Sequence, residues 1–474
     1  MTSTTTAIPA ARIGDTVRSG TLHEVTNPAD GTVASTAGWV GTDAVDQAVD
    51  AAVAVRRAWA DTPARERAAA MRSIAADLRS DVDRLAGLIV SETGKRRAEA
   101  QAEVEFSAKY FDWFGEAATT VDTTSGLTTP IRRFTVRRVP AGVVAALGTW
   151  NFPLSIPARK IAASLAAGCP TILKASERTP ATADALVVIG QRHLPTGVLG
   201  SVLGDAAISN ALIDHPQVAA VSFTGSTAIG RQVAERCAVG FTRAVLELGG
   251  RAPFIVRHDA DLADAVEQVM IAKLRNNGES CIAANNVFVH AGIAAEFTEL
   301  LAERVRAVTT GSPDDPDTDL GPLIDAAAVD RLEGLIDDAA AAGAEVTRGR
   351  PGPENGCYLS PALVECTGAD GIALWEEEVF GPVISLRTFT DESAVTDEVN
   401  GWGVGLAGYV CGTDAEANQA LAESLRVGIV GINNAAPNTP EVPFGGFGGS
   451  GLSREGGLSG YLAFTEEQTI STAR

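Results

Sequence analysis

The sequence has few basic residues, and this shortage already argues against two classes of binding partner. Among its 474 residues, Lys and Arg number 38 against 59 Asp and Glu, so the formal net charge is -21. Nucleic acids and anionic membranes are bound through basic patches, which a chain this acidic is poorly equipped to form. Its 45% hydrophobic and 20% charged residues are instead typical of a globular protein with a large core. At roughly 100–200 residues per domain, the length predicts about two to four domains.

Cysteine and histidine are also scarce and scattered. The six cysteines form no C-x-x-C pair and the five histidines form no H-E-x-x-H motif, so the sequence predicts neither a disulfide framework nor a metal site. The Thr-rich residues 1–10 lack the apolar core of a signal peptide. Residues 139–158 are uncharged over about the length of a membrane span, but three prolines and Asn151 interrupt them. We therefore expect a reduced, cytoplasmic protein without a metal or a membrane partner.

Short apolar runs alternate with helical stretches from residue 142 onward. Before them, residues 40–117 are Ala-rich, with apolar positions three and four apart through residues 45–59 and 71–90, and predict helices, the second of which ends at Gly94. Strands and helices that alternate in this way predict parallel β-α-β units in a doubly wound sheet. The expected strands are residues 142–147, 171–174, 198–203, 218–223 and 244–248, and the helices between them are residues 157–167, 180–193, 208–214 and 228–238.

A second series follows and predicts a second α/β domain, with strands near residues 254–256, 287–290 and 383–389 and helices near residues 262–274 and 293–308. Between the N-terminal helices and the first sheet, residues 119–130 are polar and β-prone, and residues 131–139 alternate basic and apolar side chains. This alternation predicts a β-ribbon.

A glycine-containing turn, residues 224–230, stands where a predicted strand gives way to a predicted helix. Its small residues, with the hydroxyl of Ser226, would let backbone N–H groups and the positive helix end approach a diphosphate. The alternative is an ordinary strand-to-helix turn. Two literal G-x-G-x-x-G matches, at residues 403–408 and 446–451, neither follow a strand nor open a helix, so we reject them as dinucleotide fingerprints.

The chain contains only five lysines, as many as its histidines. One of them, Lys174, ends a predicted strand three residues before Glu177. Nucleotides bind at the carboxyl edge of parallel sheets. An ammonium group beside a carboxylate at that edge could hold the hydroxyls of a ribose, and the alternative is a surface ion pair.

Cys281 differs from the other cysteines because it lies in a polar, Gly-containing break after a long helical stretch. A thiolate presented from such a loop is a strong nucleophile. Asn151, after the first apolar run, could donate to an oxyanion, and Glu247, at the end of another run, could activate water. Taken singly, Asn151 is more often a turn residue and Glu247 a solvated carboxylate. No Cys–His pairing is visible, which argues against a papain-like hydrolase.

Together these segments resemble the aldehyde dehydrogenase superfamily over nearly the whole chain. The resemblance implies an α/β fold with a Rossmann-type cofactor domain, an α/β catalytic domain and a small β oligomerisation element. The matching motifs, in the family's order, are Trp150-Asn151-Phe152-Pro153, Lys174-Ala175-Ser176-Glu177, Phe223-Thr224-Gly225-Ser226, Glu247-Leu248-Gly249-Gly250, Gly278-Glu279-Ser280-Cys281, Glu378-Val379-Phe380-Gly381-Pro382 and Pro443-Phe444-Gly445-Gly446.

The resemblance also implies domain bounds and a homo-oligomer. We expect the NAD-binding domain at residues 1–117 and 139–246, the catalytic domain at 247–440, and the oligomerisation element at 118–138 and 455–474. Ribbon elements of this kind pair across subunits, so we expect a homodimer or homotetramer.

By the same resemblance, Cys281 is the nucleophile that forms a thiohemiacetal and then a thioester, Asn151 belongs to the oxyanion hole, and Glu247 activates the hydrolytic water. The expected cofactor is NAD rather than NADP, because the carboxylate of Glu177 would repel a 2′-phosphate. The residues implied to contact it are Trp150, Lys174, Ser176, Glu177, Gly225, Ser226, Leu248, Glu378 and Phe380.

Within the superfamily, the chain is most similar to succinate-semialdehyde dehydrogenases. Arg159, Arg275 and Ser450 match positions that those enzymes use for the substrate carboxylate, and arginine forms strong, often bidentate bonds to carboxylates. The alternative for either arginine is a structural ion pair. Other aldehydes (glutarate semialdehyde, an aminoaldehyde or an uncharged aldehyde), acyl transfer to CoA and a non-catalytic relative remain open. Glu279, where many relatives have Gln, and Asn286, where Arg is common, depart from the family pattern.

Overall fold

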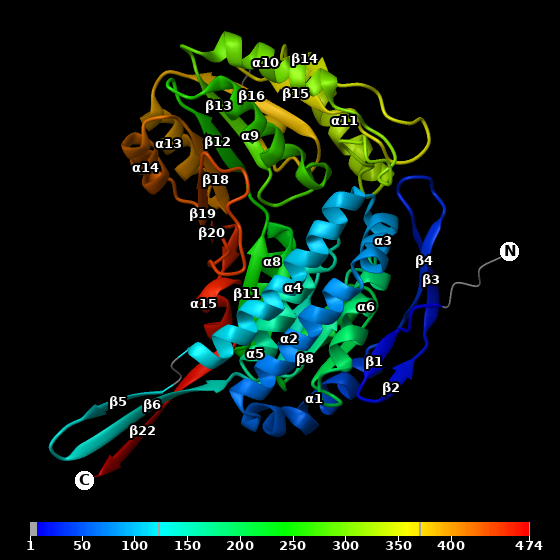
Figure 1. Cartoon of the computed structure of the whole chain (residues 1–474), viewed down its shortest axis with the longest axis vertical. Helices are drawn as coiled ribbons and strands as arrows, with labels where there is room; N and C mark the ends of the chain where they lie inside the picture. The colour runs from blue at the N-terminus through cyan, green and yellow to red at the C-terminus, as the bar shows by residue number, and fades with distance from the viewer. Residues whose placement is uncertain (1–6, 122–123, 369–370, 474) are drawn as a thin grey trace.

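The computed structural model describes residues 7–121, 124–368 and 371–473. Most of the Thr-rich start, two residues of the expected ribbon (122–123) and residue 474 of the expected C-terminal element lie outside these ranges. Figure 1 shows two α/β units stacked along the long axis, with a narrow β arm that projects from the lower unit and ends near the C-terminus.

The first sheet has a parallel centre with antiparallel strands at both edges. Its strand order is β2-β1-β9-β8-β7-β10-β11-β21, and the pairs from β9 to β11 are all parallel. Because β8 and β9 lie on one side of β7 while β10 and β11 lie on the other, the winding reverses between β7 and β10. The bounds are β1 (Ala11–Ile13), β2 (Thr16–Arg18), β7 (Val143–Leu147), β8 (Thr171–Lys174), β9 (Leu199–Val202), β10 (Val218–Gly225), β11 (Arg243–Leu248) and β21 (Gly451–Leu452).

Two apolar cores cover the opposite faces of this sheet. Successive side chains of a strand point to opposite faces, so Val143 and Ala145 pack under α1, α7 and α8, whereas Val144 and Ala146 pack under α2 to α6. The helix bounds are α1 (Asp43–Asp61), α2 (Ala64–Ser80), α3 (Val82–Thr93), α4 (Arg97–Thr120), α5 (Ser155–Ala166), α6 (Pro180–Gln191), α7 (Ala206–Asp214) and α8 (Thr227–Gly240).

The second sheet repeats this design, in the order β14-β15-β16-β13-β12-β18-β19, with only the pair β14–β15 antiparallel among those described. Phe254 and Val256 face the core under α9 and α10, and Ile255 between them faces the core under α11 to α14. The bounds are β12 (Ala252–Val256), α9 (Leu262–Leu274), β13 (Ala284–His290), α10 (Ala294–Ala307), α11 (Ala326–Ala341), β14 (Glu345–Arg348), β15 (Ala362–Glu365), α12 (Ala373–Glu376), β16 (Val383–Phe389), α13 (Glu392–Gly401), β18 (Ala407–Cys411), α14 (Ala415–Ser424) and β19 (Ile429–Ile432).

The projecting arm is a three-stranded antiparallel sheet in the order β22-β6-β5 (Figure 1). Strand β22 follows the short helix α15, so the arm joins two segments that are far apart in the sequence. The remaining elements are β3 (Thr21–Thr26), β4 (Val33–Trp39), β5 (Thr124–Thr128), β6 (Arg132–Pro140), the 3-10 turn η1 (Arg275–Gly278), β17 (Val404–Gly405), β20 (Phe447–Gly448), α15 (Gly457–Leu462) and β22 (Thr465–Ala473).

Most of the expected strands and helices are confirmed, and β8 and α9 have the predicted bounds. The helical pattern across residues 71–90 is not one helix, because the chain turns at Asp81 between α2 and α3. Strands β1 to β4 and helix α11 were not expected. Among the described residues, no helix combines the length and apolar character needed to cross a membrane.

Candidate functional site

Several of the functional residues expected from sequence lie at one edge of the first sheet. Strands β7, β8, β10 and β11 are parallel neighbours, so their carboxyl ends share that edge. Ligands of open α/β sheets bind there, where the winding reverses. The structure thus brings together the ends of four strands that the sequence separates by about a hundred residues.

Lys174 and Glu177 occupy the end of β8. Lys174 is buried and its Nζ lies 3.0 Å from Glu177 Oε2, while the glutamate is half-exposed. Burial opposes ionisation of Glu177, but the charge of Lys174 outweighs it and holds the pKa of the carboxyl below its usual value. Ser176, between them, accepts a hydrogen bond from the Arg178 N–H at 3.2 Å. The pair therefore presents a charged carboxylate and an ammonium group beside the sheet edge.

Gly225 ends β10, and Ser226 is the N-cap of α8, where its Oγ accepts a hydrogen bond from the Ile229 N–H at 3.4 Å. The hydroxyl hydrogen of Ser226 is left to donate outward. Next to it, Thr224 Oγ1 is buried and has no hydrogen-bond partner among the described residues. A strand end, a fourteen-residue helix N-terminus and a buried unpaired hydroxyl are suited to an anionic ligand such as a diphosphate.

Glu378 lies over the turn that follows β11. Its Oε1 accepts a hydrogen bond from the Gly250 N–H at 3.3 Å, and a Cβ at Gly249 would lie 2.3 Å from Glu378 Oε2, so only glycine allows this approach. Burial raises the pKa of Glu378 to about 7. Leu248 is buried beneath the same turn.

The rest of the 378–380 loop is fixed by the second unit. Lys273 of α9 donates to Val379 O at 2.9 Å, and Asn285 Oδ1 accepts from the Val379 N–H at 2.7 Å. Phe380 meets Trp150 edge-to-face at 5.7 Å between ring centroids. Trp150 and Phe380 thus form an aromatic contact between the two units.

Cys281 follows a tightly wound turn at the end of α9. Asn276, Asn277 and Gly278 all have left-handed backbones, with φ values of 58°, 56° and 77°. Their strain is held by contacts: Asn277 accepts a hydrogen bond from the Gly321 N–H at 2.8 Å and donates to Pro322 O at 2.9 Å. The sequence could not show this conformation, which turns the chain sharply before the thiol.

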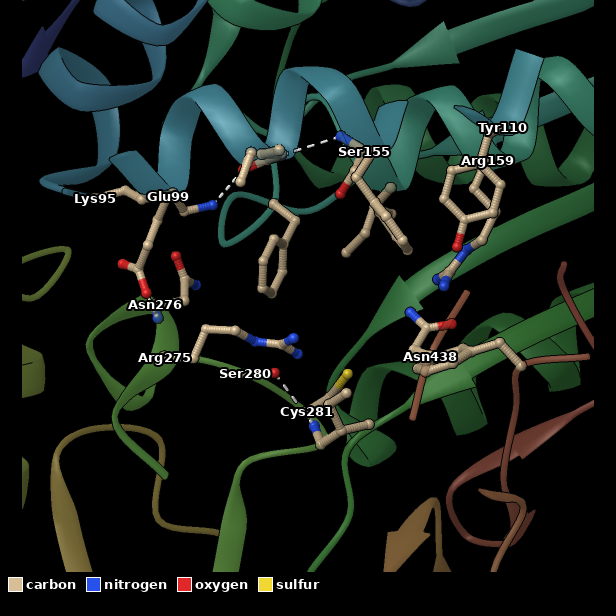
Figure 2. A pocket seen from close by; sticks show the side chains of 17 residues that line it. Lys95, Glu99, Tyr110, Ser155, Arg159, Arg275, Asn276, Ser280, Cys281 and Asn438 are labelled. Atoms are coloured by element: carbon tan, nitrogen blue, oxygen red, sulfur yellow. Dashed lines mark hydrogen bonds and ion pairs between the residues drawn. The ribbon is translucent and has the colours of Figure 1, made fainter. Parts of the chain in front are cut away.

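The thiol lines a cavity of about 210 Å³ between the two units. Figure 2 shows Cys281 at its floor, with Arg275 and Arg159 on either side. Apolar walls come from Phe106, Phe152, Ile156, Ile282 and Phe444.

The Cys281 thiol is half-buried, and burial raises its pKa to about 12, although the charge of Arg159 opposes the shift. Of the other cysteines, Cys357 is also half-buried and the remaining four are buried. The thiol at the floor of the cavity therefore stays protonated at neutral pH until a neighbouring group takes its proton.

Asn151 lies against the same loop. Its Nδ2 donates to Glu279 O at 3.1 Å, and its backbone oxygen accepts from Lys95 Nζ and Asn276 Nδ2, both at 3.0 Å. Lys95 is in turn paired with the buried Glu103, whose carboxylate caps the start of α5. Asn151 is therefore held by hydrogen bonds next to Glu279, two positions before Cys281. The second hydrogen of its amide remains available to donate to a ligand.

Glu247 is buried at the end of β11, and neither of its carboxylate oxygens has a hydrogen-bond partner among the described residues. Burial raises the pKa of Glu247 well above its usual value, and the neighbouring Glu455 adds to the shift. A carboxyl group with a perturbed pKa and with both oxygens free of hydrogen bonds to the described residues is suited to exchange a proton with a bound water.

Arg159 lies in a buried ionic network. Its Nε is 2.5 Å from Glu455 Oε2, and Lys160 Nζ is 2.6 Å from Glu455 Oε1, which also accepts from Ser222 Oγ at 2.6 Å. Burial alone would raise the pKa of Glu455, but the two cations outweigh it and lower the value. The alternative of a structural ion pair thus holds for Arg159, whose guanidinium nevertheless still lines the cavity, 4.5 Å from the Phe444 ring centroid.

Arg275 has a different environment. It also lines the cavity, yet it forms no ion pair within the described ranges. Glu99, an acid that also lines the cavity, pairs with Arg96 at 3.4 Å and accepts from the Asn276 N–H at 3.0 Å. Arg275 is therefore a cation of the cavity with no protein carboxylate to neutralise it.

The prediction for Ser450 needs correction, because the structure does not bring this residue to the cavity. Ser450 is fully buried, its Oγ accepts from the Gly405 N–H at 2.9 Å and its carbonyl accepts from the Leu248 N–H at 3.0 Å. It fastens the β20–β21 turn beneath β11. The cavity residues that the sequence analysis missed include Tyr110 on α4 and Asn438 in the loop before Phe444. Neither lies in a motif that would have identified it.

The residues at the sheet edge fit a nicotinamide dinucleotide. Lys174 and Glu177 suit the hydroxyls of the adenosine ribose, Ser226 and the α8 N-terminus suit the diphosphate, and Glu378 with Phe380 lies toward the thiol cavity. None of these cofactor-site residues lines the thiol cavity, so the cofactor and the substrate would occupy separate spaces. The two spaces would meet near Cys281. No cluster of His, Cys, Asp and Glu suited to a metal occurs among the residues with described positions.

Comparison with known proteins adds independent findings. The aldehyde dehydrogenase family model matches residues 16–470. The chain is 40% identical over 450 residues to the glutarate-semialdehyde dehydrogenase of Pseudomonas putida, covering 94% of this chain and 93% of that one. It is 39% identical over 451 residues to the succinate-semialdehyde dehydrogenase [NADP(+)] of Escherichia coli, with the same coverage of 94% and 93%. The solved structure of a succinate-semialdehyde dehydrogenase from Burkholderia pseudomallei superposes with a TM-score of 0.95 at 36% identity and 100% coverage of both chains.

Proposed function

Because the chain belongs to the aldehyde dehydrogenase family, we propose that it oxidises succinate semialdehyde, an aldehyde with a carboxylate at its far end, to succinate. The protein is an NAD(P)-dependent enzyme by its membership. The observation that carries the choice of substrate is Arg275, a cation that faces the thiol cavity without a protein partner among the described residues. A carboxylate bound there forms charge-assisted hydrogen bonds, which are among the strongest that a side chain offers.

Three side chains supply the proposed chemistry. The Cys281 thiolate attacks the aldehyde carbon, and the oxyanion of the thiohemiacetal faces the amide of Asn151 and the N–H of Cys281. NAD(P), when bound, supplies the acceptor for the hydride. The resulting thioester at Cys281 is hydrolysed by water, whose proton passes to Glu247, and cleavage of the C–S bond releases the acid and the thiol. The unoccupied oxygens of Glu247 support this role.

Glutarate semialdehyde is the second candidate substrate, because it is one methylene longer and names a relative of 40% identity. The experiment is a panel of succinate semialdehyde, glutarate semialdehyde, an aminoaldehyde and an uncharged aldehyde, read by NAD(P)H formation with and without CoA. We expect the acidic aldehydes to be turned over best, without need of CoA. In the Arg159→Ala/Arg275→Ala variant, KM should rise for acidic aldehydes only. Equal effects on charged and uncharged aldehydes would refute the carboxylate clamp, and absence of NAD(P)H with every aldehyde would indicate a non-catalytic relative.

For the cofactor, we propose NAD in preference to NADP. Glu177 stays ionised beside Lys174, so its charge would oppose a ribose 2′-phosphate. The Escherichia coli relative carries NADP(+) in its name, which makes a direct comparison necessary. We expect kcat/KM for NAD to exceed that for NADP in the wild type, and Glu177→Ser to narrow the difference. A wild-type enzyme that prefers NADP would overturn the assignment.

We propose that the arm, together with the surface around Phe241 at the end of α8, binds further copies of the chain. Strands β5 and β22 are edge strands, and unpaired edges invite pairing with another chain. Leu127 and Ile131 on the arm are 66% and 70% exposed, and Phe241 at the end of α8 is 96% exposed. Light scattering after size-exclusion chromatography should give a dimer or tetramer, and a monomer at micromolar concentration would refute this proposal.

A further inference from the structure

An ion pair between the two units lies beside the residues suited to the adenosine ribose. Arg178 directly follows Glu177 and lies just before α6 of the first unit, whereas Asp325 lies just before α11 of the second unit (Figure 1). Arg178 Nη1 is 2.6 Å from Asp325 Oδ2, and the two side chains are 44% and 31% exposed. The guanidinium is thus accessible from solvent at the sheet edge, and its charge is held by the opposite unit.

The position of Asp325 is fixed by the second unit. Its Oδ1 accepts a hydrogen bond from the Ala328 N–H at 2.8 Å and so caps α11. The N–H of the preceding Ile324 donates to Glu279 Oε1 at 3.0 Å, which ties this segment to the loop of the nucleophile. One carboxylate oxygen of Asp325 therefore serves the helix, and the other is presented to Arg178.

Arg178 is close enough to Glu177 for its charge to matter there. Burial opposes ionisation of Glu177, but the charges of Lys174 and, to a smaller extent, Arg178 outweigh burial and lower the pKa of the carboxyl. The formal charges of these three side chains and Asp325 cancel. A ribose 2′-phosphate brings about two further negative charges. It would meet the carboxylate of Glu177 while both nearby cations are already paired with protein carboxylates.

We infer that Asp325 is a positioning residue for the choice of cofactor: by pairing with Arg178, it withholds from a 2′-phosphate the cation that would offset the charge of Glu177. This inference rests on the proposed function, because it requires that the adenosine ribose binds at Lys174 and Glu177. A guanidinium released from Asp325 has two anionic partners at hand, the carboxylate of Glu177 and the phosphate. A charge-assisted bond to either one lowers the repulsion between them.

Cofactor binding in the Asp325→Asn variant tests this role without any turnover. The substitution removes the charge and keeps the cap of α11, because Asn caps a helix as well as Asp does. NAD and NADP are titrated calorimetrically into the full-length protein in the absence of aldehyde. We expect Kd for NADP to fall about tenfold, the value of one charge-assisted hydrogen bond, and Kd for NAD to change less than about twofold. In turnover, the gain should appear in KM for NADP rather than in kcat, because the adenosine end of the cofactor does not react.

Two further variants show whether the effect comes from Arg178. In Arg178→Gln/Asp325→Asn the released cation is absent, so Kd for NADP should return to within about twofold of the wild-type value. Asp314→Asn is the matched control, because it breaks another ion pair between the units, that of Arg97 Nη2 and Asp314 Oδ1 at 2.6 Å. It should leave Kd for both cofactors within about twofold of wild type.

The inference would be overturned if Asp325→Asn bound NADP no more tightly than wild type. It would equally be overturned if that variant lost affinity for NAD and NADP alike, as simple loosening of the two units would cause, or if Arg178→Gln/Asp325→Asn kept the gain. The proposed preference for NAD fails separately, by a wild type that binds NADP more tightly than NAD. A further tenfold gain for NADP in Asp325→Asn would still support the role of Asp325 in that case.

Discussion

The two arginines of the thiol cavity have the same sequence signal and opposite environments. Arg159, on α5, is 5% exposed and shares Glu455 with Lys160. Arg275, in η1, is half-buried and has no ion-pair partner within the described part of the chain. A protein carboxylate therefore pairs with the cation of the first wall, whereas the described residues offer no such partner to the cation of the second. A cation in a substrate site is available to an anion in proportion to how little the protein itself neutralises it.

Of the variants that test this difference between the two arginines, loss of Glu455 should have the largest effect, a loss of protein stability. Glu455→Gln leaves Arg159 and Lys160 buried without their counterion, and removal of one partner of a buried pair costs about 3–5 kcal/mol of unfolding free energy. Urea denaturation measures the loss. Glu467→Gln removes an exposed partner of Arg138 and should cost under about 1 kcal/mol. Similar losses in the two variants would show that the buried network does not stabilise the fold.

Replacement of Arg275 should affect binding and leave stability alone. In Arg275→Ala we expect KM for succinate semialdehyde to rise about 10- to 100-fold, the value of a charge-assisted hydrogen bond. KM for an uncharged aldehyde should change less than about threefold, and the urea midpoint should stay at the wild-type value. Arg159→Ala, by contrast, should raise KM and also lower stability, because it strands Glu455. If Arg275→Ala destabilised the protein as much as Arg159→Ala, the contrast between the two walls would be wrong.

The contrast between the two arginines illustrates that the sequence predicts strands, helices and motifs but not the tertiary partners of individual side chains. The strands of the first sheet were predictable because runs such as residues 143–147 are apolar on both faces, as a covered parallel strand requires. The break at Asp81 was not, because no Pro or Gly stands there. The nucleophile loop was found from its polar residues, whereas the pairing of Arg159 with Glu455, nearly three hundred positions away, depends on tertiary packing.

Ser450 and Asn438 illustrate two ways in which a sequence motif fails to identify cavity residues: Ser450 was predicted and does not line the cavity, and Asn438 lines the cavity and was not predicted. Ser450 lies in a recognisable glycine-rich motif, but the motif does not say which side of its turn faces the cavity, and the side chain packs inward on Gly405. Asn438 lies in an irregular loop without a periodic pattern, and only the folded cavity identifies it. Local motifs predict which elements form the site better than which side chains reach the ligand.

The rate of Cys281 alkylation should also differ between variants of the two arginines, by a smaller factor than KM does. The pKa of Cys281 near 12 predicts that its rate with iodoacetamide in the cofactor-free enzyme rises about tenfold per pH unit, without a plateau below about pH 10. The charge of Arg159 lowers that pKa, so Arg159→Met should slow alkylation several-fold at a given pH, and Arg275→Met should change it less. Subtraction of the Cys281→Ser rate removes the contribution of Cys357. A plateau near neutral pH would mean that the thiol is already ionised.

Glu279, two positions before Cys281, gives the smallest effect on activity, because it is fully buried and does not line the cavity. Burial raises its pKa to about 8, and its Oε1 accepts a hydrogen bond from the Ile324 N–H at 3.0 Å. The folded pKa exceeds the unfolded one, so the stability from the protonated form is complete below about pH 4.5 and is lost as pH rises through about 8. A glutamine side chain at this position would resemble the protonated acid and keep the Ile324 contact.

We therefore expect Glu279→Gln to keep kcat/KM at pH 7 within about twofold of wild type. Its urea midpoint should match wild type below about pH 4.5, exceed it by a growing margin as pH rises, and exceed it most above about pH 8, where wild-type Glu279 is ionised in a buried site. Glu377→Gln, at an exposed position paired with Arg331, should show no such gain. If Glu279→Gln were less stable than wild type at high pH, the carboxylate would have to be held there by a cation. Lys95 and Arg178, the cations whose charges act on Glu279, would be the candidates for that role.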